Sequence, residues 1–322
     1  MLTRERVVVT GAAGFVGQAV VRAFSDAGFE VTATDCVRSP KLLQSQYPHV
    51  QYVIGDVADP SFVSGLVRRR SVGGIVHGAA YTPGSSPSAA VARKMVHTAI
   101  AGTVNIAREA EIGRLRVVLI SSAAVYPRAA PSCVTERDAD GGGSLYGALK
   151  LACEEVVVSF LSGSRTPYCF VRPTALYGRG ESSSVSRPKT SAVARAIEVG
   201  LSGRRPVPDV PDLSEDWLHV DDCAGAIRDL YAKPDLLVGP YTVSSGELTK
   251  YGTLFEVIAH ITQSTDAPEE VVHCGQGRHC LLSNDALRTA TGWRPVRSLR
   301  QGLQECAVRA ATVELTRCDG PP

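Results

Sequence analysis

Short apolar runs alternate with longer amphipathic stretches through the first 178 residues of the chain. The runs are rich in β-branched residues, a composition typical of strands that are buried on both faces of a sheet. They lie at Val7–Val9, Glu30–Thr34, Val50–Ile54, Gly74–His77, Arg116–Ile120 and Tyr168–Arg172. The amphipathic stretches predict helices at Phe15–Ala27, Ser61–Arg70 and Ala90–Glu111, and from about Ser144 onward. Because strands alternate with helices, we predict an α/β fold with a doubly wound parallel sheet and right-handed crossovers.

The pattern weakens beyond residue 178. Residues 179–191 are rich in Ser, Arg and Pro, and residues 203–214 form a proline-bearing, loop-like segment. A helix is predicted over Cys223–Ala232, with Asp221 or Asp222 as its N-cap, because a carboxylate accepts hydrogen bonds from free backbone N–H groups. The remaining residues mix short strands and helices.

Composition narrows the class of protein. The chain has 322 residues, of which 44% are apolar and 20% charged, as in ordinary globular proteins. Its formal net charge is +2 without a long Lys/Arg cluster, so nothing favours a nucleic-acid partner. No apolar run approaches the ~18 residues of a membrane span, and no signal-peptide core follows Met1. We therefore expect a cytoplasmic protein with no membrane partner.

The nine cysteines are scattered, which is typical of reduced thiols in a chain of this size. Two His–Cys pairs lie close together, at His273-Cys274 and His279-Cys280. Structural zinc sites prefer shorter cysteine spacings, so we predict a loop between two strands and no metal.

A glycine-punctuated turn follows the first apolar run. Gly11 permits a tight turn, Gly14 allows a pyrophosphate to approach the backbone, and Gly17 allows the next helix to pack on the strand. The N-terminus of that helix offers free N–H groups and a positive dipole end to phosphates. The turn therefore predicts a dinucleotide site, with contacts from Gly11, Ala13, Gly14, Phe15 and Val16.

Asp35 ends the second apolar run, where a carboxylate binds the 2′-hydroxyl of a ribose. This carboxylate would repel a 2′-phosphate, so NAD is favoured over NADP, although Arg38 lies nearby in the sequence. Asp56 and Val57 follow another strand at the edge where ligands bind in such sheets. Ala79 and Ala80 are small enough for the backbone to pass close to a cofactor, whereas His77 before them is predicted to be a packed or capping residue and not a catalyst.

Ser122, Tyr146 and Lys150 form a set of residues suited to hydride-transfer chemistry. Tyr146 and Lys150 are four residues apart and share one helical face. The Lys150 ammonium would stabilise a phenolate, so that Tyr146 can take a proton from a substrate alcohol as hydride leaves its carbon. Ser122 would hold the same substrate oxygen, and Lys150 would also reach the nicotinamide ribose.

With these motifs the chain resembles the extended short-chain dehydrogenases/reductases, the NAD-dependent epimerase/dehydratase family. The resemblance covers nearly the whole chain. It is carried by Thr10–Gly17, Gly55-Asp56-Val57, His77–Ala80, Ser121-Ser122, Tyr146–Lys150, Arg172-Pro173, Tyr177-Gly178, Asp216–Asp222 and Gly292–Pro295.

The resemblance implies a Rossmann-like domain over residues 1–178 that holds NAD, with a returning segment at about 215–235. It implies a smaller, interleaved C-terminal α/β substrate domain over residues 179–214 and 236–322. It adds Pro173, Tyr146 and Lys150 to the cofactor contacts, and a homodimer built on the helices Ala90–Glu111 and Tyr146–Leu161.

Departures from the family pattern bear on the substrate. Ala123 stands where dehydratases and decarboxylases carry an acidic residue, so dehydration is not expected. Ala175 and Glu215 stand where nucleotide-sugar epimerases usually have Asn and Arg at the diphosphate, and a carboxylate would repel it. Ala99 replaces a family Asn on the long helix. Arginines at 187, 204 and 205 could replace the missing cations. The predicted substrate contacts are Thr82, Ser122, Ala123, Thr174 and Arg187.

Three hypotheses follow. The first is an NAD-dependent oxidoreductase acting on a secondary alcohol or ketone of a sugar, sugar acid or similar polyol, with Tyr146 as general acid/base. The second is a nucleotide-sugar epimerase that keeps NAD tightly bound. The third is a protein that binds NAD without turnover.

Overall fold

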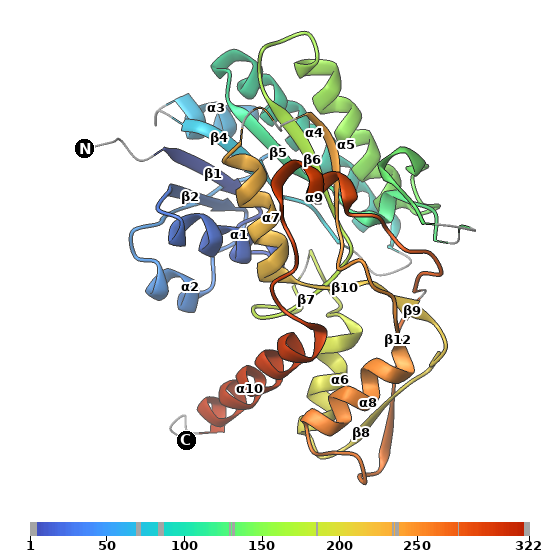
Figure 1. Ribbon diagram of the computed structural model, residues 1–322. Coiled ribbons are helices and arrows are strands. Elements are labelled where there is room, and N and C mark those ends of the chain that lie inside the picture. Colours follow the sequence, from blue (N-terminus) through green and yellow to red (C-terminus); the bar gives the residue numbers. More distant parts are fainter. Residues whose placement is uncertain are drawn as a thin grey trace.

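The structure is a computed structural model that describes residues 5–68, 72–82, 87–128, 130, 133–184, 186–233, 235, 238–275 and 277–318. Seven strands form a central sheet in the order β11-β6-β5-β4-β1-β2-β3, and neighbouring strands in it are parallel (Figure 1). The strands are β1 (Arg6–Thr10), β2 (Glu30–Asp35), β3 (Gln51–Ile54), β4 (Val72–His77), β5 (Arg116–Ile120), β6 (Tyr168–Pro173) and β11 (Val238–Val243). The predicted α/β fold is confirmed.

Helices cover both faces of this sheet, because alternate residues of each buried strand point to opposite faces. Val7 and Val9 of β1 pack with α1 (Phe15–Asp26), α2 (Lys41–Gln46) and α7 (Val220–Tyr231). Val8 packs instead with α3 (Pro60–Arg68), α4 (Ala89–Gly113) and α5 (Leu145–Leu161). The result is a three-layer arrangement with the sheet in the middle.

A further apolar cluster lies outside the central sheet, in a smaller lobe whose helices are below the sheet in Figure 1. It is formed mainly by α6 (Ala192–Leu201), α8 (Tyr251–Ile261) and α10 (Leu299–Cys318). Three two-stranded sheets accompany it: β7 (Ala175–Tyr177) with β10 (Trp217–His219), β9 (Ser214–Glu215) with β12 (Thr249–Lys250), and β8 (Arg205–Pro208) with β13 (Glu269–Val272). The short helices η1 (Ala123–Val125), η2 (Glu136–Asp138) and α9 (Asp285–Thr291) complete the described elements.

Two details differ from the sequence prediction. β11 is an edge strand of the central sheet, although its segment was assigned to the substrate domain that resumes at residue 236. Helix α7 begins at Val220, and its N-cap is His219, whose Nδ1 accepts from Asp221 N at 3.2 Å. The predicted caps are wrong because Asp221 and Asp222 are drawn into ion pairs with arginines of other elements.

None of the helices in the described residues is long and apolar enough to cross a membrane. Among the same residues, no group of three His, Cys, Asp or Glu side chains is arranged to hold a metal ion.

Candidate active site

The glycine turn joins β1 to α1 at the carboxyl edge of the sheet. Gly11 has φ +69°, a backbone conformation that favours glycine. A Cβ on Gly17 would lie 2.0 Å from the carbonyl oxygen of Gly11, so only glycine allows α1 to come this close to the strand. Gly14 is the N-cap of α1, with no side-chain cap and no acidic residue in the first turn. The helix N-terminus is therefore left for an external anion.

Asp35 and the end of β4 lie on either side of this turn. Asp35 Oδ2 accepts from Ala13 N at 3.0 Å, and Oδ1 accepts from Val37 N at 3.3 Å. On the β4 side, Ala79 N donates to Thr10 Oγ1 at 3.3 Å. The structure thus brings together the turn, the predicted ribose carboxylate and the small residues after β4.

The other predicted cofactor contacts also follow strands of the sheet. Asp56 is exposed just after β3, and Val57 beside it is buried. Ala80 is partly exposed after β4, and Pro173 is the last residue of β6.

The predicted catalytic residues meet at the end of β5. Ser122 follows this strand, and its Oγ accepts from Ala124 N at 3.1 Å. A Cβ on Gly147 would lie 2.2 Å from the carbonyl oxygen of Ala124, so the first turn of α5 is packed directly against the segment after Ser122. Lys150 Nζ lies 5.7 Å from the centre of the Tyr146 ring and donates to the carbonyl of Ile120 at 2.7 Å. The tyrosine, the ammonium and the end of β5 thus form one cluster.

A buried polar network supports this cluster from below, and sequence reasoning missed it. Glu154, one helical turn beyond Lys150, accepts two hydrogen bonds from Arg172, at 2.9 and 2.5 Å. It also accepts from Ser121 Oγ at 2.5 Å. Arg172 reaches Tyr126 Oη as well, at 3.2 Å. These residues fix the backbone that carries Ser122 and Pro173, and no local motif links them in the sequence.

Glu215 is the central charged group on the substrate-domain side. Its side chain is only 13% exposed, and Arg278 Nε lies 3.8 Å from its Oε1. Burial raises the pKa of the Glu215 carboxyl, against the opposing charge of Arg278. Arg278 also donates to the carbonyls of Pro127 at 2.9 Å and Ala123 at 2.9 Å. Arg278 was not predicted, since only the tertiary structure brings it to the segment after Ser122.

The predicted substrate contacts separate into three places. Ser122 and Ala123 lie together after β5, although Ala123 is buried. Thr174 is buried and its Oγ1 donates to Asp216 at 3.1 Å. Thr82 N donates to Ser186 O at 2.7 Å in the segment after β7. Arg187 follows in the same segment, and its guanidinium carbon lies 4.8 Å from the centre of the Phe15 ring of α1. All five lie on segments that follow strands of the central sheet or β7, and their role as substrate contacts stays a prediction.

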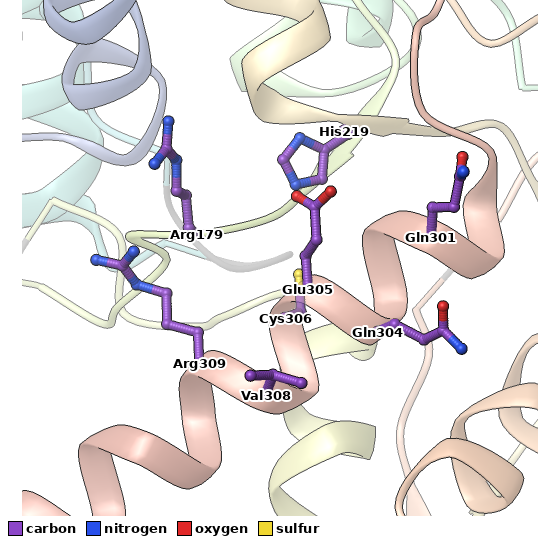
Figure 2. Close-up of a pocket in the computed structure, with 8 residues that line it drawn as sticks. All are labelled: Arg179, His219, Gln301, Gln304, Glu305, Cys306, Val308 and Arg309. Atoms are coloured by element: carbon purple, nitrogen blue, oxygen red, sulfur yellow. The ribbon is translucent and has the colours of Figure 1, made fainter.

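A separate cavity of about 540 Å³ lies between α10 and the segment after β7 (Figure 2). Burial lowers the pKa of His219 at its rim, against the neighbouring charge of Asp221. Its lining residues are Arg179, His219, Gln301, Gln304, Glu305, Cys306, Val308 and Arg309. None of the predicted catalytic residues is among them.

A parallel sheet of this order, with a glycine turn between β1 and α1, defines a dinucleotide-binding protein. The sequence profile of the NAD dependent epimerase/dehydratase family matches residues 7–246, and the chain belongs to this family.

Known proteins resemble the chain over most of its length. The dTDP-L-rhamnose 4-epimerase of Burkholderia thailandensis is 24% identical, with 94% of this chain and 93% of that protein covered. A 3 beta-hydroxysteroid dehydrogenase/Delta 5-->4-isomerase of Mycobacterium tuberculosis is 28% identical over 63% of this chain and 56% of that protein. The solved dTDP-glucose 4,6-dehydratase of Bacillus anthracis in complex with NAD has a TM-score of 0.84 at 20% identity, with 97% and 98% of the two chains covered. This structural likeness shows the shared fold.

NAD is the cofactor of this family, and the residues of the turn fit it. The helix N-terminus is uncapped, and a Cβ on Gly14 would lie 3.1 Å from the carbonyl oxygen of Gly11, where glycine leaves the approach to the backbone open. The turn Gly11–Val16 would hold the pyrophosphate, and Asp35 the adenosine ribose. Lys150 would reach the nicotinamide ribose.

Proposed function

We propose that the protein is an NAD-dependent oxidoreductase of the extended short-chain dehydrogenase/reductase type. Its substrate is a secondary alcohol or ketone of a sugar, sugar acid or similar polyol that carries no diphosphate. The observation that carries this choice is Glu215, a buried carboxylate on the substrate side of the site. Arg278 lies 3.8 Å from this carboxyl group, so Glu215 offsets its positive charge and leaves it less available to a diphosphate.

Two further arginines that the sequence offers as cations for a diphosphate are paired with other carboxylates. Arg204 and Arg205, on or beside β8, lie 3.9 and 3.6 Å from Glu270 and Glu269 of β13. The similarity to a 3 beta-hydroxysteroid dehydrogenase/Delta 5-->4-isomerase gives further support, since a hydroxysteroid is a secondary alcohol without a diphosphate.

NAD, when bound, supplies the hydride acceptor or donor. The Tyr146 hydroxyl takes the proton of the substrate alcohol, or returns it to a ketone in the reverse direction. The Lys150 ammonium, anchored on the carbonyl of Ile120, stabilises the phenolate form of Tyr146. Ser122 donates a hydrogen bond to the same substrate oxygen and fixes its position.

The test is an anaerobic assay of NADH formation with a panel of free sugars, uronic acids, aldonic acids and UDP-sugars. We expect NADH with a free compound, and a fall in turnover of about 10²- to 10⁴-fold in Tyr146→Phe. NAD binding by calorimetry should persist in this variant. No NADH formation with any of the free compounds would reject the proposal.

A nucleotide-sugar epimerase is the second candidate, favoured by the relative with that activity in its name over more than nine-tenths of this chain. In this case a UDP- or dTDP-sugar changes configuration by NMR without net NADH, and NAD copurifies with the protein. The two outcomes are mutually distinguishable in the same panel.

We also propose a homodimer that uses α4 and α5, which pack on each other along one face of the sheet. Exposed apolar side chains support this surface: Val96 and Ile112 on α4 are 43% and 55% exposed, and Leu145 on α5 is 39% exposed. A cytoplasmic location is consistent with the unpaired state of the described cysteines.

A further inference from the structure

The segment after β7 runs back to the N-terminal end of α1. We call residues 178–184 and 186–191 the strap. Near its start, Gly180 O accepts from Gln18 Nε2 of α1 at 3.5 Å, and Arg179 Nε lies 2.8 Å from Asp221 Oδ2. Figure 2 shows that Arg179 lies at the edge of the cavity beside α10. The start of the strap is thus fixed against α1 and the first turn of α7.

The far end of the strap is held by a buried carboxylate. Glu181 accepts from Ser191 N at 2.6 Å and from Ser191 Oγ at 2.8 Å. Its side chain is only 3% exposed. Arg187 Nη2 donates to the same carboxylate at 2.5 Å, so Glu181 ties the strap into a closed loop.

Arg187 is thereby positioned over the first residue of α1. Its guanidinium carbon lies 4.8 Å from the centre of the Phe15 ring, within the range of a cation–π contact. Phe15 directly follows Gly14, the uncapped N-cap of α1. A guanidinium has five N–H donors, and the structure shows one of them on Glu181. The remaining donors stay available beside the phosphate end of the cofactor site.

We propose that Arg187 binds the pyrophosphate of NAD, with Phe15 and Glu181 holding its guanidinium in place. Two oxygens of a phosphate match the fork of a guanidinium, and the charge pair strengthens both hydrogen bonds. Arg187 is already restrained on both sides, so binding costs little additional side-chain entropy. The strap therefore contributes a cation to cofactor retention, in place of the substrate contact that the sequence predicted for Arg187.

The inference rests on NAD as cofactor and not on the identity of the substrate. Its test therefore measures NAD binding without substrate, by titration calorimetry on the full chain freed of bound cofactor. The variants are Arg187→Gln, Arg187→Lys and the matched control Lys189→Gln. Lys189 is an exposed residue of the same strap, so its replacement removes the same charge from the same segment.

We expect Arg187→Gln to weaken NAD binding by about 10- to 100-fold, the usual effect of losing a charged hydrogen bond. The NAD affinity of Arg187→Lys should lie between those of the wild-type protein and Arg187→Gln. Lysine keeps the positive charge but lacks the planar pair of N–H donors that binds two phosphate oxygens. Lys189→Gln should change binding by less than about twofold, because an exposed charge is screened by salt. Phosphorus NMR of bound NAD should show shifted pyrophosphate signals in Arg187→Gln, and a thermal melt should show the fold intact.

Three results would overturn the assignment. The first is NAD affinity in Arg187→Gln no weaker than in Lys189→Gln. The second is unchanged phosphorus signals despite weaker binding. The third is unchanged NAD affinity with a raised substrate KM, which would return Arg187 to the substrate site.

Discussion

His77 illustrates how burial decides the role of a single residue. Its Nδ1 lies 2.7 Å from Thr10 Oγ1, and its Nε2 lies 3.4 Å from Thr103 Oγ1. Burial, with the charge of Lys150 as a smaller cause, lowers the pKa of His77 to about 3. The sequence prediction that His77 is a packed residue is confirmed.

This neutral histidine should make stability depend on pH. The folded pKa of about 3 lies below the ordinary value of 6.5, so below pH 6.5 the unfolded chain binds a proton that the folded chain refuses. The contribution of neutral His77 to the free energy of unfolding is complete above pH 6.5. It falls by up to ~1.4 kcal/mol per pH unit as the pH decreases toward 3. Urea unfolding at several pH values should give a shallower slope for His77→Gln. Equal slopes in the two proteins would contradict the assignment.

The buried pair of Glu154 and Arg172 should be sensitive to loss of one partner. Their side chains are only 3% and 4% exposed, so Glu154→Gln leaves a guanidinium charge in the core. We expect a loss of about 3–5 kcal/mol in the free energy of unfolding. Glu155→Gln, at the exposed neighbouring position, is the control and should change little. Similar losses of unfolding free energy in both variants would show that the buried ion pair stabilises the fold no more than the exposed Glu155 does.

At the scale of elements, close approach between backbones sets the site. Helix α1 lies near enough to β1 to present its N-terminus beside Asp35, and α5 lies near enough to η1 to place Tyr146 beside the end of β5. Each approach depends on a glycine in the first or second turn of the helix. The glycine spacing that the sequence displays is thus a packing requirement as much as a ligand requirement.

Two helical glycines allow this idea to be tested. In Gly17→Ala the new Cβ would meet the carbonyl of Gly11, and we expect a loss of about 1–3 kcal/mol in stability together with weaker NAD binding. In Gly225→Ala, inside α7, nothing lies within 4 Å of the new Cβ. That variant should gain roughly 0.5–1 kcal/mol because alanine is the better helix former. Chemical unfolding and calorimetry measure both effects, and a neutral Gly17→Ala would refute the packing argument.

At the scale of the whole molecule, the central sheet with its helices and the smaller lobe around α6, α8 and α10 are built from interleaved segments of chain. The central sheet is completed by β11, which the chain reaches only after it has formed α6 and returned through α7 (Figure 1). The Asp216 carboxylate joins segments that follow different strands of the sheet. It accepts from Thr174 Oγ1 after β6 and from Ser245 N and Gly246 N after β11. Burial raises the pKa of this carboxyl, while these hydrogen bonds oppose the shift.

The proposed dimer is tested at this scale. Val96→Glu places a charge on the exposed face of α4, and we expect the protein to shift from dimer to monomer in light scattering coupled to size exclusion. Val296→Glu is the control, because Val296 is 83% exposed and lies far along the chain from α4 and α5. A monomeric wild-type protein, or a Val96→Glu variant that stays dimeric, would refute this surface.

The sequence by itself determined the first six strands of the central sheet, because buried β-branched runs and amphipathic helices leave few alternatives to a parallel α/β arrangement. It also determined the glycine turn and the spacing of Tyr146 and Lys150, since these depend on local backbone geometry or on one helical turn. Asp35 was predictable because adjacent parallel strands end at the same edge of the sheet.

Only the tertiary structure decided where distant residues meet. The place of β11 in the sheet, the Glu154–Arg172 network, Arg278 beside Glu215 and Arg187 over Phe15 all join positions that lie far apart in the chain. The cap of α7 depends on ion pairs with other elements for the same reason. Such contacts form by burial and charge pairing once the elements have packed, so no pattern of neighbouring residues in the sequence predicts them.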